Sequence, residues 1–280
     1  MGEAEVVQRT EVPATVESLQ ADLRALGLRP GMVVLVHSSL SAMGWVCGGS
    51  VAVIAALREV LSSAGTLVMP AHSPDLSEPT GWKNPPVPEP WWPLIREHMP
   101  AYDPVLTPTR SMGLIAETFR KQPDVLRSAH PQVSFCACGP HAAHITGDHS
   151  LAFGLGEHSP LARIYELHGF VLLLGVDHAN NTSLHLAEHR ATFPTKRVIK
   201  EGAPISSDSR RWTTFEDVDI DSSDFDRIGE DFLRSDAGNA VRLGEVALAA
   251  CQLIPQRGLV DFAVSWIEEN RSAETSGPKR

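Results

Sequence analysis

The sequence predicts an α/β fold in which a central mixed sheet is flanked by helices. The first elements carry most of this prediction: a β-branched run at residues 32–37, an amphipathic helical pattern at residues 51–63, and a second strand at residues 66–71. A strand, a helix and a further strand in this order indicate that at least part of the sheet is parallel. The apolar segment "FVLLLGV" at residues 170–176 has the composition of a central strand.

The remaining elements have start and stop signals of their own. A helix is expected at residues 15–26, because Thr15 suits an N-cap and Gly27 a C-terminal end. Residues 72–103 are rich in proline and tryptophan, so we expect no regular element there. The other expected helices span residues 111–122, 159–169 and 180–191, and the other expected strands span residues 133–139 and 210–220. An acidic turn and two or three helices should follow.

The composition favours one globular domain. The chain has 280 residues, of which 42% are hydrophobic and 21% charged, as in ordinary soluble proteins. We expect a single catalytic α/β domain at residues 15–269 and flexible tails at residues 1–14 and 270–280, which are polar and aperiodic. No apolar run approaches the length of a membrane helix, and the acidic start lacks the features of a signal peptide. A cytoplasmic protein, monomeric or homodimeric, is therefore expected, with no membrane partner.

The net charge of the chain indicates which class of binding partner to expect. A formal net charge of −10 disfavours nucleic acid and favours a small cationic substrate. The alternative is an acidic surface that serves solubility alone. The cysteines form no Cys-x-x-Cys pair, which indicates free thiols at Cys47, Cys136, Cys138 and Cys251.

The stretch "HLAEH" contains His185, Glu188 and His189 in the pattern H-x-x-E-H. Two histidines four residues apart share a helix face, so one interpretation is a zinc hydrolase site with Glu188 as base. In a second interpretation, Glu188 accepts the Nδ1 proton of His185 and orients that imidazole as a general base. A third is a simple ion pair on a helix surface.

Two further groups have both functional and structural interpretations. The loop at residues 37–50 leads from a strand into a helix through two glycines, which suits either an anion-binding turn or an ordinary connection. Acidic residues occur at Asp75 and in the stretch "FEDVDID". They form either a cation-binding pocket or a solvated surface, and their positions in the stretch are Glu216, Asp217, Asp219 and Asp221.

Four stretches together resemble the aminoglycoside 3-N-acetyltransferase family. They occur in the order of that family at residues 33–49, 66–79, 104–131 and 159–191. The resemblance implies transfer of an acetyl group from acetyl-CoA to the 3-amino group of a 2-deoxystreptamine antibiotic, with antibiotic resistance as the outcome. It also implies an α/β fold particular to this family, distinct from the usual N-acetyltransferase fold, and no metal.

The resemblance also implies roles for individual residues. His185 and Glu188 match the family's His-x-x-Glu and are expected to be catalytic, which leaves His189 incidental. The expected acetyl-CoA contacts are His37, Ser38, Ser39, Ser41, Met43, Gly44, Thr107, Thr109, Arg110, Met112 and Gly113. The expected contacts of the cationic aminoglycoside are Asp75, Glu216, Asp217 and Asp219. The loop with Trp82, Trp91 and Trp92 is expected to shape the acceptor site or to cover a sheet edge.

Other functions remain open at this level. A non-antibiotic amine could be the acceptor, with the chemistry unchanged. A covalent route through Cys47 and a binding protein without catalysis are further alternatives.

Overall fold

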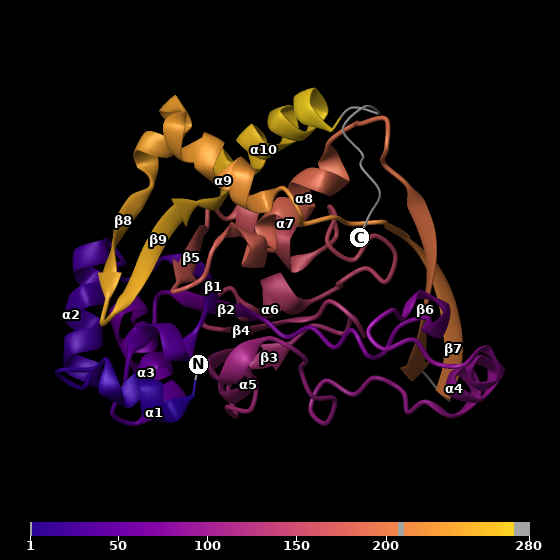
Figure 1. The fold of residues 1–280 in the computed structure, drawn as a ribbon, viewed down its shortest axis with the longest axis horizontal. Helices are drawn as coiled ribbons and strands as arrows, with labels where there is room; N and C mark the ends of the chain where they lie inside the picture. The colour runs from indigo at the N-terminus through magenta and orange to yellow at the C-terminus, as the bar shows by residue number, and fades with distance from the viewer. Residues whose placement is uncertain (1, 207–209, 272–280) are drawn as a thin grey trace.

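The computed structural model of the chain describes residues 2–206 and 210–271. Seven strands form one mixed sheet in the order β3-β4-β2-β1-β5-β9-β8 (Figure 1). The parallel centre consists of β1 (Val33–Ser38), β2 (Thr66–Pro70) and β5 (Phe170–Leu174). Antiparallel strands extend the centre on both sides: β3 (Leu126–Arg127), β4 (Phe135–Cys138), β8 (Arg242–Val246) and β9 (Ala249–Pro255). The predicted mixed α/β sheet is confirmed.

Helices cover both faces of this sheet, because side chains alternate along its buried strands. Val34 and Val36 of β1 belong to one hydrophobic core, and Val33 and Leu35 belong to the other. The first core is closed by α2 (Val16–Leu26), α3 (Gly49–Leu61) and α5 (Gly113–Phe119). The second is closed by α6 (Ala142–Thr146), α7 (Pro160–Glu166), α8 (Ser183–Arg190), α9 (Phe225–Arg234) and α10 (Gln256–Asn270).

The carboxyl ends of the parallel strands meet at one edge. His37 of β1 pairs with Leu173 of β5, and His72 follows two residues after β2 ends at Pro70. The 3-10 turn η4 (His178–Asn180) and then α8 leave β5 at the same edge. Ligands bind at such an edge in open α/β sheets, so this topology brings residues far apart in sequence to one place.

A second sheet stands apart from the first (Figure 1). It is an antiparallel hairpin of β6 (Val198–Ser206) and β7 (Arg210–Val218). The segment from η2 (Pro79–Gly81) through η3 (Glu89–Trp91) to α4 (Trp92–His98) packs beside it, and the Tyr102 backbone N–H donates to the Pro204 carbonyl over 3.0 Å. The expectation of no regular element at residues 72–103 is wrong, because Pro93 lies in the first turn of α4, where proline costs no helix hydrogen bond.

Other local predictions fare unevenly. Thr15 caps α2, and Gly27 ends it with φ of 113°, as expected. Strands β6, β8 and β9 and the short elements η1 (Leu40–Met43) and η5 (Asp236–Ala240) were not anticipated. No helix among the described residues is long and apolar enough to cross a membrane.

Both expected tails hold ordered structure. Residues 1–14 contain α1 (Glu3–Gln8), whose Val6 is buried, and Ala14 pairs with Val46. Helix α10 continues to Asn270, and Arg271 makes several side-chain contacts. Residues 272–280 of the expected C-terminal tail lie outside the described residues. At the C-terminal end, buried ion pairs with Glu188 and Asp224 hold Arg271 in place.

Candidate active site

Helix α8 presents His185 and Glu188 as a hydrogen-bonded pair. The Nδ1–H of His185 donates to Oε2 of Glu188 over 2.5 Å. This contact fixes the tautomer and leaves Nε2 with its lone pair, available to accept a proton. The His185 side chain is 12% exposed and the Glu188 side chain 1%, and the Phe225 ring lies 4.8 Å from the imidazole. A surface ion pair is thereby excluded, because the carboxylate is buried.

The other oxygen of Glu188 is bound as well. Oε1 accepts from Arg271 Nη1 over 2.5 Å and from the backbone N–H of Asp221 over 3.0 Å. Burial pushes the pKa of Glu188 upward, but the hydrogen bonds and charges of His185 and Arg271 outweigh burial, so its pKa is lowered. Glu188 is therefore an ionised, fully hydrogen-bonded carboxylate at neutral pH.

Other histidines around the pair are held neutral. Burial first, and the charge of His185 second, lower the pKa of His37 to about 3. The same two causes, burial first, lower the pKa of His72 to about 3 as well. His37 Nε2 lies 3.3 Å from the Thr182 hydroxyl, which joins the end of β1 to the start of α8. His185 thus sits among imidazoles that do not compete with it for a proton near neutral pH.

His189 has separate surroundings. Its Nε2 lies 3.6 Å from Asp217 Oδ1, and its ring packs edge-on against Phe153. Burial lowers its pKa to about 4. Within residues 2–206 and 210–271 no three His, Cys, Asp or Glu side chains are grouped to hold a metal ion. The zinc interpretation therefore lacks its third protein ligand in this part of the chain.

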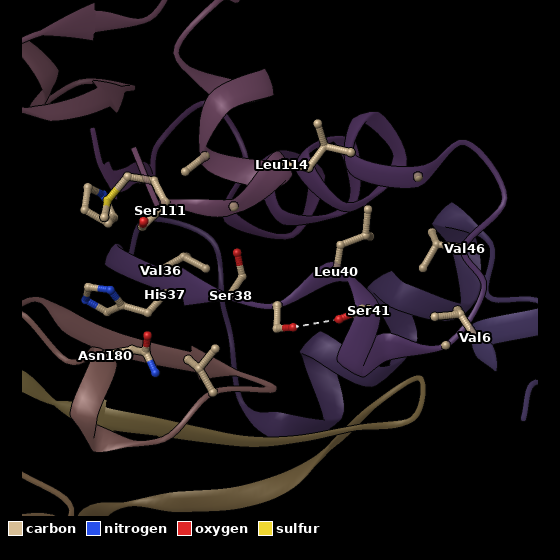
Figure 2. Close-up of a pocket in the computed structure, with 18 of the residues that line it drawn as sticks. Val6, Val36, His37, Ser38, Leu40, Ser41, Val46, Ser111, Leu114 and Asn180 are labelled. Atoms are coloured by element: carbon tan, nitrogen blue, oxygen red, sulfur yellow. Dashed lines mark hydrogen bonds between the residues drawn. The ribbon is translucent and has the colours of Figure 1, made fainter. Parts of the chain in front are cut away.

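A pocket of about 920 Å³ opens at the same edge of the sheet (Figure 2). Its walls come mainly from the loop after β1 and from the start of α5, and Thr182, three residues before His185, also lines it. The hydroxyls of Ser39 and Ser41 lie 3.2 Å apart within it. Of the expected acetyl-CoA contacts, seven line this pocket: His37, Ser38, Ser39, Ser41, Gly44, Met112 and Gly113.

The other expected acetyl-CoA contacts lie elsewhere. Met43 is buried in the core beneath the pocket wall. The Thr107 hydroxyl accepts from the Asp103 backbone, and the Thr109 hydroxyl donates to Glu117 over 2.7 Å. Arg110 forms an ion pair with Asp75, an expected aminoglycoside contact. The family resemblance assigned these two residues to different ligands, whereas the fold pairs them with each other.

The expected acids near residue 217 do not all face the same side of β7, because successive side chains of a strand point to opposite faces. Asp217 faces the site, and its Oδ2 accepts from the Gly154 N–H over 3.2 Å. Burial raises its pKa and outweighs the lowering by backbone hydrogen bonds from Val218 and Gly154 and by the charge of His185. Glu216 is exposed on the opposite face. Asp219 lies just beyond β7, and its backbone N–H donates to the Arg197 carbonyl.

A second carboxylate joins Asp217. Glu201 on β6 lies opposite Phe215, two residues from Asp217 and on the same face of the hairpin. Burial raises its pKa, and the charge of Asp217 adds to that rise. Gln132 donates to it over 3.5 Å. The hairpin thus carries two half-buried carboxylates on one face, and Asp217 is the one that the charge of His185 affects.

The tryptophan loop forms a separate hollow. Trp82 and Trp91 line an apolar pocket of about 490 Å³ with residues of α4, and neither lines the larger pocket. The loop packs against the far end of the β6–β7 hairpin, where Arg210 Nε donates to the Met99 carbonyl.

Sequence reasoning missed Arg271, Glu201 and Asn180. Asn180 lines the large pocket beside His37 (Figure 2). Arg271 was assigned to a tail, and Glu201 lies 15 residues before Glu216, the first acid of the acidic stretch. Residues 198–206 read "VIKEGAPIS" and show no alternation of polar and apolar residues, so the sequence carried no local signal for Glu201.

The chain matches a known family over most of its length. The model of the aminoglycoside 3-N-acetyltransferase family matches residues 35–268. The chain belongs to this family. It is 47% identical over 269 residues to YokD of Bacillus subtilis (strain 168), an SPbeta prophage-derived aminoglycoside N(3')-acetyltransferase-like protein, with 95% of this chain and 97% of that protein covered. It is 37% identical to aminoglycoside N(3)-acetyltransferase VII of Streptomyces paromomycinus, with 98% of each covered.

Solved structures agree with this assignment. AAC-IIIb in its binary complex with CoASH has a TM-score of 0.83 at 34% identity, with 95% of this chain and 100% of that chain covered. AAC-VIa bound to sisomicin has a TM-score of 0.82 at 29% identity, with coverages of 93% and 99%. The family fold expected from the sequence is confirmed, and the family's enzymes use acetyl-CoA.

Proposed function

We propose that this chain transfers the acetyl group of acetyl-CoA to the 3-amino group of a 2-deoxystreptamine aminoglycoside and so confers resistance to it. The observation that carries the proposal is the buried His185–Glu188 pair, one helical turn from Thr182 at the wall of the large pocket. Membership of the family supports the reaction, and the CoASH and sisomicin complexes of relatives support the two ligands.

His185 supplies the base that the reaction needs. An aminoglycoside amine is mostly protonated at neutral pH and has no lone pair for attack. His185 Nε2 removes this proton and passes it to solvent, while Glu188 stabilises the imidazolium. The free amine then attacks the thioester carbonyl, with both reactants held together in one complex.

Completion of the transfer needs one further proton movement. The attack gives a tetrahedral adduct whose nitrogen carries one proton more than the amide. His185 accepts this proton as the carbon–sulfur bond breaks and delivers it to the departing thiolate. The products are the amide and CoA thiol, and His185 returns to its neutral form. Donors for the transient oxyanion are proposed among the backbone N–H groups and hydroxyls of residues 38–44.

The acceptor is proposed to bind against the β6–β7 hairpin. Glu201 and Asp217 lie on one face of it, and the charge of His185 acts on Asp217. Two carboxylates suit a polycation. One observation favours a second candidate acceptor, a smaller non-antibiotic amine. The ion pair between Asp75 and Arg110 removes one expected acid from the acceptor side, so the site carries less negative charge than the sequence suggested.

A CoA-release assay with a panel of amines tests the proposal. The chain is incubated with acetyl-CoA and single aminoglycosides, with simple diamines, or with no acceptor. We expect thiol release above the blank with 2-deoxystreptamine aminoglycosides and a product acetylated at the 3-amino group, read by NMR. Release with simple diamines alone would support the second acceptor class. No release with any amine would refute the transferase activity.

A further inference from the structure

Arg271 contacts the proposed catalytic pair from the end of α10. Its Nη1 donates to Glu188 Oε1 over 2.5 Å. Its Nε and Nη2 donate to the two carboxylate oxygens of Asp224 over 2.8 and 2.6 Å, and Nη2 also donates to the Asp221 carbonyl. The Arg271 side chain is only 12% exposed, and it lies three residues beyond the segment that matches the family model.

These contacts form a chain of alternating charges. Asp224, Arg271 and Glu188 are joined in that order, and His185 follows at Glu188 Oε2. A buried carboxylate is stable as an anion only when both oxygens are hydrogen-bonded and its charge is compensated. With a neutral imidazole the chain of four groups carries one net negative charge. With an imidazolium it is neutral, so the arrangement favours the state that forms during turnover.

We propose that Arg271 is a positioning residue for the transfer reaction, which holds the Glu188 carboxylate ionised and fixed against Nδ1 of His185. This inference rests on the proposed role of His185 as the base. Arg271 touches neither substrate nor reacting atoms. It acts through Glu188, and Asp224 in turn fixes the guanidinium plane with two parallel hydrogen bonds.

Other titratable groups in the described part of the chain lie near these four linked side chains, and none of them compensates the charge of Glu188 as Arg271 does. Burial, and to a smaller extent the charge of His185, lowers the pKa values of His37, His72 and His189 to about 3 or 4. These three imidazoles are therefore neutral near neutral pH. Asp217 faces His185 from β7. Lys196 feels the charge of Glu188, but its amine donates to the carbonyls of His189 and Ala191. Among the described residues, only the guanidinium of Arg271 is ion-paired with Glu188 from outside α8.

The proposal predicts that the acid limb of the pH profile of kcat/KM shifts in a direction set by the sign of the charge removed. The base is active when His185 is neutral and Glu188 ionised. Arg271→Met removes a positive charge, so the pair takes up its first proton more readily, and the acid limb of kcat/KM should move up by about one pH unit. Asp224→Asn leaves the Arg271 charge uncompensated and should move that limb down. Glu188→Gln should also move it down, because the anion that stabilises the imidazolium is gone.

The experiment measures pH profiles of kcat/KM and, separately, the NMR titration of His185 in the full chain. The His185 resonance is assigned by its loss in His185→Asn. Arg271→Met should also lower kcat/KM at its optimum by roughly 10- to 100-fold, the scale seen when a histidine loses a fixed partner. Arg271→Lys keeps the charge and should keep the limb near its original pH with partial activity. Arg234→Ala, which removes an exposed arginine of α9, is the matched control.

The two readouts separate this inference from the proposed function. If no amine is acetylated, the proposed function fails, but the NMR titration still reports how Arg271 acts on His185. Opposite shifts for Arg271→Met and Asp224→Asn support the inference. An unshifted His185 titration in a folded Arg271→Met, or shifts in the same direction for both variants, would overturn it. Should Arg271→Met fail to fold, Asp224→Asn alone decides the question. A His185 titration that moves to lower pH in this variant supports the inference, and one that stays in place overturns it.

Discussion

The two sides of the candidate site are built in different ways. The pocket side comes mainly from two short segments, the loop after β1 and the start of α5. Among the described residues, the one carboxylate in its lining is Glu3 of α1. The hairpin side comes from β6 and β7, and there Glu201 and Asp217 share one face. Shape and uncharged hydrogen-bonding groups should therefore govern acetyl-CoA binding, whereas charge should govern the cationic acceptor. Substitutions on the two sides should change different KM values.

The largest effect is expected between the two sides, at the base. His185→Ala should lower kcat by roughly 100- to 10,000-fold. Burial lowers the pKa values of the neighbouring His37 and His72 to about 3, so these imidazoles are too weakly basic to replace it. His189→Ala is the matched control on the same helix and should stay within a few-fold of the parent chain, because its partners are Asp217 and Phe153. Steady-state rates measure both. Equal losses in the two variants, with stoichiometric bound metal, would restore the zinc interpretation.

A smaller effect is expected on the pocket side. Gly113 has φ of +79°, and a Cβ there would lie 3.6 Å from the Ser38 carbonyl at the pocket wall. Gly113→Ala introduces backbone strain at this wall and should raise the KM for acetyl-CoA about tenfold, equivalent to roughly 1.4 kcal/mol. The KM for the acceptor should not change. A rise in both values would show that the two sides are not independent.

The smallest effect is expected on the hairpin side. Glu201→Gln or Asp217→Asn should raise the KM for the acceptor by about three- to tenfold, the scale of one partly screened ion pair, with a smaller effect at high salt. Glu216→Gln, on the opposite face of β7, is the control and should leave that KM unchanged. Titration of KM against salt concentration measures the difference. An equal rise in the control would assign the effect to overall charge.

The pH dependence of acceptor binding also distinguishes the hairpin side from the pocket side. Burial raises the pKa of Asp217 above its usual range, so this carboxylate becomes protonated at a higher pH than an exposed aspartate. The KM for the acceptor should therefore rise on the acidic side as pH falls through that raised pKa. Asp217→Asn should remove this rise, and the KM for acetyl-CoA, measured in parallel, should not follow it.

The parts of the fold that were predicted are those fixed by local sequence. Thr15 and Gly27 bound α2 because an N-cap and a left-handed glycine act within one turn. The central strands were found because both of their faces are buried. Strand β8 was missed because four of its five residues are exposed, so it shows no hydrophobic alternation. Helix α4 was missed because the effect of a proline depends on its place within the turn.

The sequence alone determined the His185–Glu188 pair, because residues three apart on a helix meet whatever surrounds them. For the loop after β1, the residues themselves left an anion-binding turn or an ordinary connection open, and the family resemblance assigned it to acetyl-CoA. The expectation that His185 lies near the carboxyl end of a central strand came from the order of strand and helix. Only the tertiary structure decided what occupies the second oxygen of Glu188 and which acids face the site. Arg271 reaches Glu188 across 83 residues, and Asp217 and Glu201 share a face through strand register. Contacts of that range depend on how the elements pack, and no local pattern encodes them.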